Sequence, residues 1–137
     1  MTTSDLPQPI LPDGWMRGSG YAHGMAARGR LLVTAGQIGW DPITARLGTD
    51  DFVTQVGQAL RNVVAVLRAA GAGPEHLVRL TWYITTRDEY LSAGTALADV
   101  YRSAVGAHYP AMAVVVVSAL LDPRAKVEIE GMAVLPE

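Results

Sequence analysis

The stretch His108-Tyr109-Pro110-Ala111-Met112-Ala113 leads directly into four consecutive valines, Val114 to Val117. The residue before a proline is restricted mostly to extended backbone, so Tyr109-Pro110 predicts a rigid entry into a strand. A β-branched run without polar alternation is typical of a strand that is buried on both faces. We therefore expect residues 112–117 to form an interior strand, with Met112 facing another part of the protein rather than solvent.

Two other segments carry apolar side chains at the spacing of an amphipathic helix. The first covers residues 52–70, and Asp50 or Asp51 precedes it as the expected N-cap, where a carboxylate accepts from free backbone N–H groups. Gly71 follows this segment and predicts its end. The second covers residues 89–105. We expect two long helices.

Three further segments have the alternation or composition of strands. Residues 77–84 and 126–134 alternate apolar with polar side chains, and residues 21–36 read as a hairpin around Gly29. Residues 1–19, rich in Pro, Asp, Ser and Gly, read as an irregular N-terminal arm. The order β-β-α-β-α-β-β predicts a single α+β domain over residues 1–137, a sandwich of one mixed sheet with two helices on one face.

The composition limits the kinds of partner and chemistry. Without cysteine there is no disulfide, thiolate nucleophile or Cys-ligated metal, which suits a cytoplasmic protein. A net charge of -2 gives no basic footprint for nucleic acid, and no apolar run reaches membrane-spanning length. Half of the residues are hydrophobic and 18% are charged. Because the second sheet face has nothing left in the chain to cover it, we expect self-association.

Several short motifs occur together in a specific order and spacing. They are Gly20-Tyr21-Ala22-His23, Thr34-Ala35-Gly36-Gln37, Asp41-Pro42, Gln55, Asn62, Tyr101, Tyr109-Pro110-Ala111 and Val127-Glu128-Ile129-Glu130. In this arrangement the chain resembles the RidA/YjgF family of reactive-intermediate (imine/enamine) deaminases, some of which carry the older label endoribonuclease L-PSP. The resemblance implies a fold similar to trimeric chorismate mutase, a homotrimer, three clefts between subunits, and chemistry without a cofactor.

The resemblance also implies roles for individual residues. Family deaminases hydrolyse 2-imino or 2-enamino acids, with a glutamate of the last strand holding the attacking water and an N-terminal tyrosine lining the cleft. Glu128 and Tyr21 occupy these positions and are the predicted catalytic residues. Gly36 and Gln37 belong to the loop whose backbone contacts the substrate. The family's carboxylate-binding arginine directly follows Pro-Ala, and this position holds Met112.

The exchange of arginine for Met112 changes the expected substrate. A guanidinium binds a carboxylate through two parallel charge-assisted hydrogen bonds, and methionine offers a flexible apolar wall instead. At about 1.5–3 kcal/mol per such bond, the loss weakens binding of a 2-imino acid by roughly two orders of magnitude. We expect a neutral, aromatic or larger ligand, unless Lys126, two residues before Glu128, supplies a charge on the same strand face.

Three polar or aromatic candidates each have two interpretations. His23, beside Tyr21, either exchanges protons with a ligand or is a structural histidine bonded to a backbone carbonyl. Trp40 either stacks on a flat ligand or packs the loop that carries Gln37. Glu130 shares a strand face with Glu128, and a solvated carboxylate on an edge strand is the simpler interpretation. The three histidines show no metal-ligand spacing, so no metal is expected.

Three functions remain as hypotheses. The first is hydrolysis of an imine or enamine to a carbonyl compound and ammonia, on a substrate other than simple 2-imino acids. The second is a non-catalytic, small-molecule-binding or regulatory trimer, which Met112 favours. The third is ribonuclease action or translation inhibition, against which the acidic chain and the lack of an aromatic RNA platform both argue.

Overall fold

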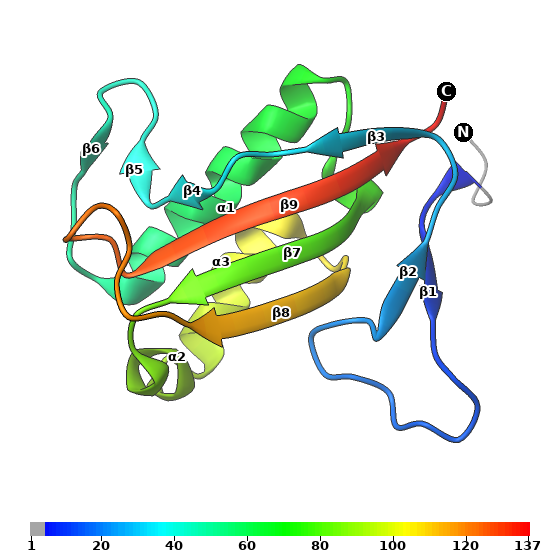
Figure 1. Cartoon of the computed structure of the whole chain (residues 1–137), viewed down its shortest axis with the longest axis horizontal. Coiled ribbons are helices and arrows are strands. Elements are labelled where there is room, and N and C mark those ends of the chain that lie inside the picture. The colour runs from blue at the N-terminus through cyan, green and yellow to red at the C-terminus, as the bar shows by residue number, and fades with distance from the viewer. Residues whose placement is uncertain (1–4) are drawn as a thin grey trace.

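The computed structural model describes residues 5–137 and contains one main sheet with helices on one face. The strands of this sheet are, in order across it, β3 (Arg30–Val33), β9 (Val127–Leu135), β7 (Leu77–Ile84) and β8 (Ala111–Val116), and β4 (Gln37–Ile38) also pairs with β9. β7 and β8 are parallel and the other pairs are antiparallel. Helices α1 (Phe52–Ala69) and α3 (Thr95–Val105) lie behind the sheet in Figure 1. The predicted α+β fold with one mixed sheet is confirmed.

The helix α1 supplies most of the helical side of the core. Asp51 caps it, since its carboxylate accepts from the backbone N of Thr54 at 2.9 Å. The apolar stripe of the helix is fully buried against β7 and β9, including Val56, Leu60 and Val63. The predicted cap and helix are confirmed.

The predicted hairpin over residues 21–36 is wrong. Its first half forms β2 (Gly24–Ala26), which pairs antiparallel with β1 (Gln8–Ile10), while β3 pairs with β9. Gly29 does adopt a positive φ of 144°, but its backbone packs against the carbonyl of Leu135 at the end of β9. The turn therefore directs the chain onto β9 instead of back onto β2.

The same pairing corrects the prediction of an irregular arm over residues 1–19, because β1 lies within it. Residues 1–4 of that arm lie outside the described residues. Two short strands, β5 (Trp40–Asp41) and β6 (Arg46–Leu47), form a separate small hairpin. The 3-10 turn Pro74–His76 precedes β7.

The predicted second helix is two helices. The helix α2 (Arg87–Ser92) ends before Gly94, whose φ of 58° is outside the right-handed helical region, and α3 starts after it. In the part of the chain that the structure describes, no helix is both long and apolar enough to cross a membrane.

The prediction that the valine run is buried on both faces is also wrong. β8 is an edge strand, and Val115 and Val116 are 42% and 50% exposed. The sheet face opposite the helices also exposes Leu31 and Val33 at 63% and 60%. A β-branched run thus marks an apolar face that a single chain leaves uncovered.

Candidate functional site

The residues predicted to form one cleft lie on two faces of the main sheet. β9 alternates buried with half-buried side chains, so Ile129 enters the core and Glu128 faces away from the helices. On β8, Met112 is in register with the buried Leu80 and packs against the core on the helix side. A single chain therefore does not bring Glu128 and Met112 into one cleft.

On the outer face, the side chain of Glu128 lies against the backbone of Gly36. A Cβ atom at Gly36 would overlap Glu128 Oε2 and would lie 2.8 Å from its Cδ. The next strand, β4, pairs Ile38 with Glu128 and keeps this turn beside the carboxylate. Because Gly36 is exposed and Glu128 is half-buried, a ligand or a water molecule has access to the carboxylate and to the adjacent backbone.

The loop that follows Gly36 is fixed to α1. The buried Asn62 donates from Nδ2 to the carbonyl oxygens of Ile38 and Trp40, at 3.3 and 3.0 Å. Trp40 Nε1 in turn donates to Gln37 Oε1 at 3.3 Å. In this structure the indole of Trp40 thus holds the loop, and the side chain of Gln37 is engaged within it.

The helix α1 also determines where Lys126 points. Gln55 is fully buried and accepts from the backbone N of Lys126 at 2.8 Å, while its Nε2 donates to the carbonyls of Thr49 and Arg124. The ammonium of Lys126 pairs with Glu89 of α2 at 2.9 Å. This ion pair argues against the alternative in which Lys126 supplies a charge beside Glu128, because its ammonium is directed toward α2.

Tyr83 is a polar residue of the outer face that the sequence interpretation did not single out. It lies opposite Glu128 on β7, and its hydroxyl donates to Glu130 Oε1 at 2.7 Å. This hydrogen bond, with a smaller effect of desolvation, raises the pKa of Tyr83. Glu130 is therefore bound by a neighbour, and β9 is an interior strand, which corrects the interpretation of Glu130 as an edge-strand carboxylate.

On the helix side, Met112 lines a pocket of about 280 Å³ at the edge of β8. The other lining residues are Ser19, Gly20, Tyr21, Tyr90 and Val114. The pocket contains no charged side chain, so it offers nothing to pair with a carboxylate. Within one chain, Tyr21 and Met112 thus line the same pocket, and Glu128 does not.

His23 is next to Tyr21 and is engaged by the backbone. Its Nε2 lies 3.1 Å from the carbonyl oxygen of Met16, so that nitrogen carries the hydrogen and donates. Its ring makes edge contacts with the rings of Trp15 and Tyr21, both with centroids 5.2 Å apart. Within residues 5–137, no group of three or more His, Asp or Glu side chains is placed to hold a metal ion.

Comparison with known proteins identifies the class to which this fold and these motifs belong. Residues 17–135 match the family model described as Endoribonuclease L-PSP. A RutC family protein of Synechocystis is 33% identical over 98% of this chain and 94% of its own length. The 2-iminobutanoate/2-iminopropanoate deaminase of Capra hircus is 33% identical over 77% of this chain and 73% of its own length.

Solved structures give the same result. The Rid family protein YyfB of Yersinia pestis has a TM-score of 0.82 and 33% identity, and the match covers 94% of this chain and 98% of that one. E. coli TdcF with bound serine has a TM-score of 0.65 and 29% identity, with 97% and 95% covered. The chain belongs to the RidA/YjgF family.

Proposed function

We propose that this protein hydrolyses an imine or enamine, without a cofactor, in a cleft formed between two copies of the chain. The observation that carries the proposal is the Glu128 carboxylate held beside the Gly36 backbone on a sheet face that one chain leaves uncovered. The relatives named as 2-iminobutanoate/2-iminopropanoate deaminases support the class of reaction.

In this proposal Glu128 is the acid-base group. It takes a proton from a water molecule as the water oxygen bonds to the imine carbon, and it then gives a proton to the nitrogen. Glu128 next takes the proton of the new hydroxyl group and gives it to the same nitrogen. The carbon–nitrogen bond then breaks, ammonia leaves and the carbonyl forms, so that one imine and one water give one carbonyl compound and one ammonia. Tyr21 lines the cleft and orients the substrate, and the backbone at Gly36 and Gln37 contacts its polar end.

The cleft needs a second copy because Tyr21 and Met112 lie on the opposite side of the sheet from Glu128. The uncovered apolar side chains of β3 support self-association. We propose the homotrimer that the family resemblance implies, in which the β8 edge of one subunit meets the outer sheet face of the next. The neighbour's Tyr21 and Met112 would then face Glu128.

The substrate in this proposal is not a simple 2-imino acid. The Met112 pocket contains no charge, and Lys126 is paired with Glu89. An uncharged imine with an aromatic or aliphatic body fits a thioether-lined wall better than a carboxylate does.

The test measures how fast imines generated in situ by an oxidase disappear, with semicarbazide trapping the remainder. One imine is neutral, from benzylamine, and one is a 2-imino acid, from leucine. We expect the protein to accelerate hydrolysis of the neutral imine more, and Glu128→Gln to abolish the acceleration. Glu137→Gln, at the exposed C-terminus, is the matched control. Met112→Arg is expected to shift the preference toward the 2-imino acid.

A second function, ligand binding without catalysis, is favoured by the absence of an arginine at position 112. This second function predicts that the wild type accelerates hydrolysis of neither the benzylamine-derived imine nor the leucine-derived 2-imino acid. Saturable binding of a neutral imine analogue such as benzaldehyde oxime, unaffected by Glu128→Gln, would then replace the hydrolase proposal.

A further inference from the structure

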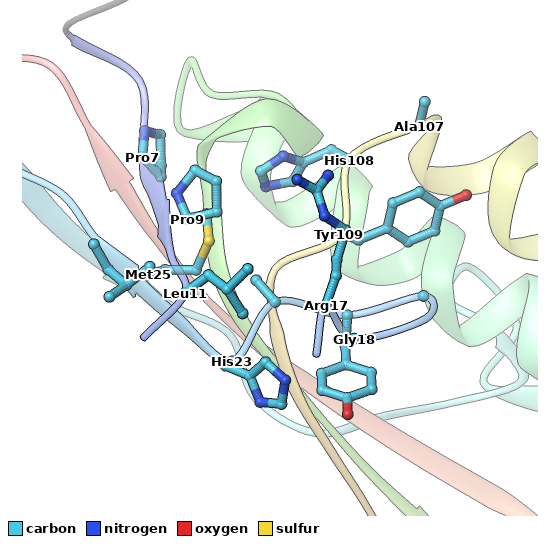
Figure 2. A pocket seen from close by; sticks show the side chains of 14 residues that line it. Pro7, Pro9, Leu11, Arg17, Gly18, His23, Met25, Ala107, His108 and Tyr109 are labelled. Carbon is cyan, nitrogen blue, oxygen red and sulfur yellow. The ribbon is translucent and has the colours of Figure 1, made fainter. Parts of the chain in front are cut away.

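A second and larger cavity, of about 500 Å³, lies between the arm loop (residues 11–23), β1 and the segment leading into β8 (Figure 2). Neither Met112 nor Glu128 lines it, whereas Gly20 and Tyr21 line both this cavity and the Met112 pocket. The two sides of the cavity are joined where the backbone N of Ala22 donates to the carbonyl of Pro110 at 3.1 Å. The cavity is therefore built within one chain.

The arm loop is held on both sides of Arg17. Before it, the Met16 carbonyl accepts the hydrogen bond from His23. After it, Gly18 packs so closely on the ring of Tyr21 that a Cβ atom there would lie 2.7 Å from Cε2. These two contacts fix the backbone from which the Arg17 side chain extends.

The opposite wall, His108 and Tyr109, is held just as firmly. His108 Nε2 donates to the carbonyl of Leu77 at 2.7 Å, and the His108 carbonyl accepts from Tyr101 Oη at 2.7 Å. Tyr109 stacks on Tyr101, with ring centroids 5.2 Å apart and planes at 10°. Burial raises the pKa of Tyr101, so it stays a neutral donor at physiological pH. Both walls are thus set before any ligand arrives.

Arg17 is the only permanently charged side chain among the described residues that line this cavity. Figure 2 shows its side chain extending across the cavity toward His108. Its guanidinium makes no hydrogen bond or ion pair within residues 5–137. Much of the remaining lining is apolar, including Pro7, Pro9, Ile10, Leu11 and Met25. Arg17 is exposed, so its guanidinium is free to pair with an anion that enters the cavity, beside walls that suit an apolar body.

We infer that this cavity binds a small organic monocarboxylate with an aromatic or branched aliphatic body. The carboxylate pairs with the planar fork of Arg17, which matches it through two parallel hydrogen bonds. A single cation balances one negative charge, whereas a phosphate dianion would leave one charge unpaired. The body of the ligand packs on Leu11, Met25 and Tyr109. Tyr21 and His23 also line this cavity, but the inference does not rest on the proposed hydrolase activity, because the ligand is held by Arg17 and by apolar side chains to which that proposal gives no role.

The experiment compares naphthalen-2-ylacetate with its neutral amide by calorimetric titration of the full chain. We expect the acid to bind about tenfold more tightly than the amide. Arg17→Gln should remove that difference while leaving the affinity for the amide unchanged. Arg68→Gln, an exposed arginine on α1, should keep the difference and is the matched control. Leu11→Ala should weaken both ligands equally, because it removes a shared apolar contact.

Methyl NMR locates the bound acid. The methyl signal of Met25 should shift on titration, and that of Met132, on the outer sheet face, should not. The inference is overturned if neither ligand binds the wild type, if acid and amide bind equally, or if a correctly folded Arg17→Gln keeps its preference for the acid. A shift of Met132 without one of Met25 would also overturn it, by placing the ligand elsewhere.

Discussion

At position 36 the backbone has room for a hydrogen atom and no more, since an added Cβ would overlap the carboxylate of Glu128. Gly36→Ala should therefore push that carboxylate aside or shift the turn. A displacement of about 1 Å in catalytic geometry lowers a rate by roughly a hundredfold. We expect a loss of imine hydrolysis of that order, measured by semicarbazide trapping, with β9 and its core contacts intact by circular dichroism.

Gly48 provides the matched control for this substitution. A Cβ atom there would meet nothing within 4 Å, and Gly48 has no positive φ. Gly48→Ala should therefore leave the rate unchanged and leave stability equal or slightly higher. If Gly36→Ala is as active as Gly48→Ala, the contact between Gly36 and Glu128 has no role in the reaction.

The hydrogen bond from Tyr83 to Glu130 predicts a pH-dependent stability. This bond raises the folded-state pKa of Tyr83 above the ordinary 10.0. Its stabilisation is therefore complete below the unfolded-state pKa and is lost as the pH rises through the folded-state value. Denaturant unfolding from pH 8 to 11.5 should show the wild type losing its advantage over Tyr83→Phe.

Tyr21→Phe is the control for that experiment, because the Tyr21 hydroxyl makes no hydrogen bond within the described residues. It should differ little from the wild type in stability at pH 8. An advantage of the wild type over Tyr83→Phe that stays constant across the range would show that the bond to Glu130 contributes nothing.

The start of α1 is the clearest element-scale test. Asp51 accepts from Thr54 through both the backbone N and the hydroxyl, and these bonds lower the pKa of the Asp51 carboxyl. Asp51→Ala should cost about 1 kcal/mol of unfolding free energy at pH 7, whereas Asp51→Asn should keep most of the cap. With a lowered folded-state pKa, the carboxylate stabilises above its ordinary 3.8 and loses this effect as the pH falls through the folded value. Equal stability of Asp51→Ala and wild type would refute the cap.

The elements that the sequence predicted well are those defined by their own periodicity. The apolar spacing of residues 52–70, followed by Gly71, was sufficient for α1. The pairing of β2 with β1 was not predictable in this way, because it depends on which distant segment offers a free edge. The break between α2 and α3 had a local signal, Gly94, but a glycine within a helical pattern is often tolerated.

The sequence predicted only part of the site, because the rest depends on how distant segments are placed in the fold. The family resemblance predicted that Glu128, Gly36, Tyr21 and Met112 share one cleft. Within one chain, Glu128 lies against Gly36, and Tyr21 lines a separate pocket with Met112. The separation of these two pairs across the sheet depends on which face each strand position takes, which the motifs do not encode. Tyr83 was overlooked because its partner Glu130 is 47 residues away along the chain. Strand alternation alone placed it on the outer face.

At the scale of the whole molecule, the outer sheet face predicts self-association. Leu31 and Val33 are exposed side by side on β3, opposite Val134 and Met132 of β9. A charge in this patch would be buried without a partner at an interface. Val33→Glu should therefore dissociate the oligomer, measured by light scattering after size-exclusion chromatography. Ile43→Glu is the control, because Ile43 is 92% exposed on the loop between β5 and β6. A wild type that is already monomeric would contradict the prediction.

If the cleft joins Tyr21 of one copy to Glu128 of the next, two inactive variants should complement each other. Tyr21→Ala and Glu128→Gln, unfolded together and refolded at equal amounts, form mixed oligomers. A cleft that receives its tyrosine from one variant and its glutamate from the other is intact. Random assembly makes about a quarter of the clefts intact, so about a quarter of the wild-type rate should return.

The same mixture carrying Val33→Glu in both chains should stay inactive, because the copies no longer meet. A mixture without Val33→Glu that is as inactive as its two parents would show that Tyr21 of one copy and Glu128 of the next do not form a shared cleft. Two inactive variants can complement each other only across an interface between copies. Such an interface is necessary because Glu128 and Met112 lie on opposite faces of one sheet.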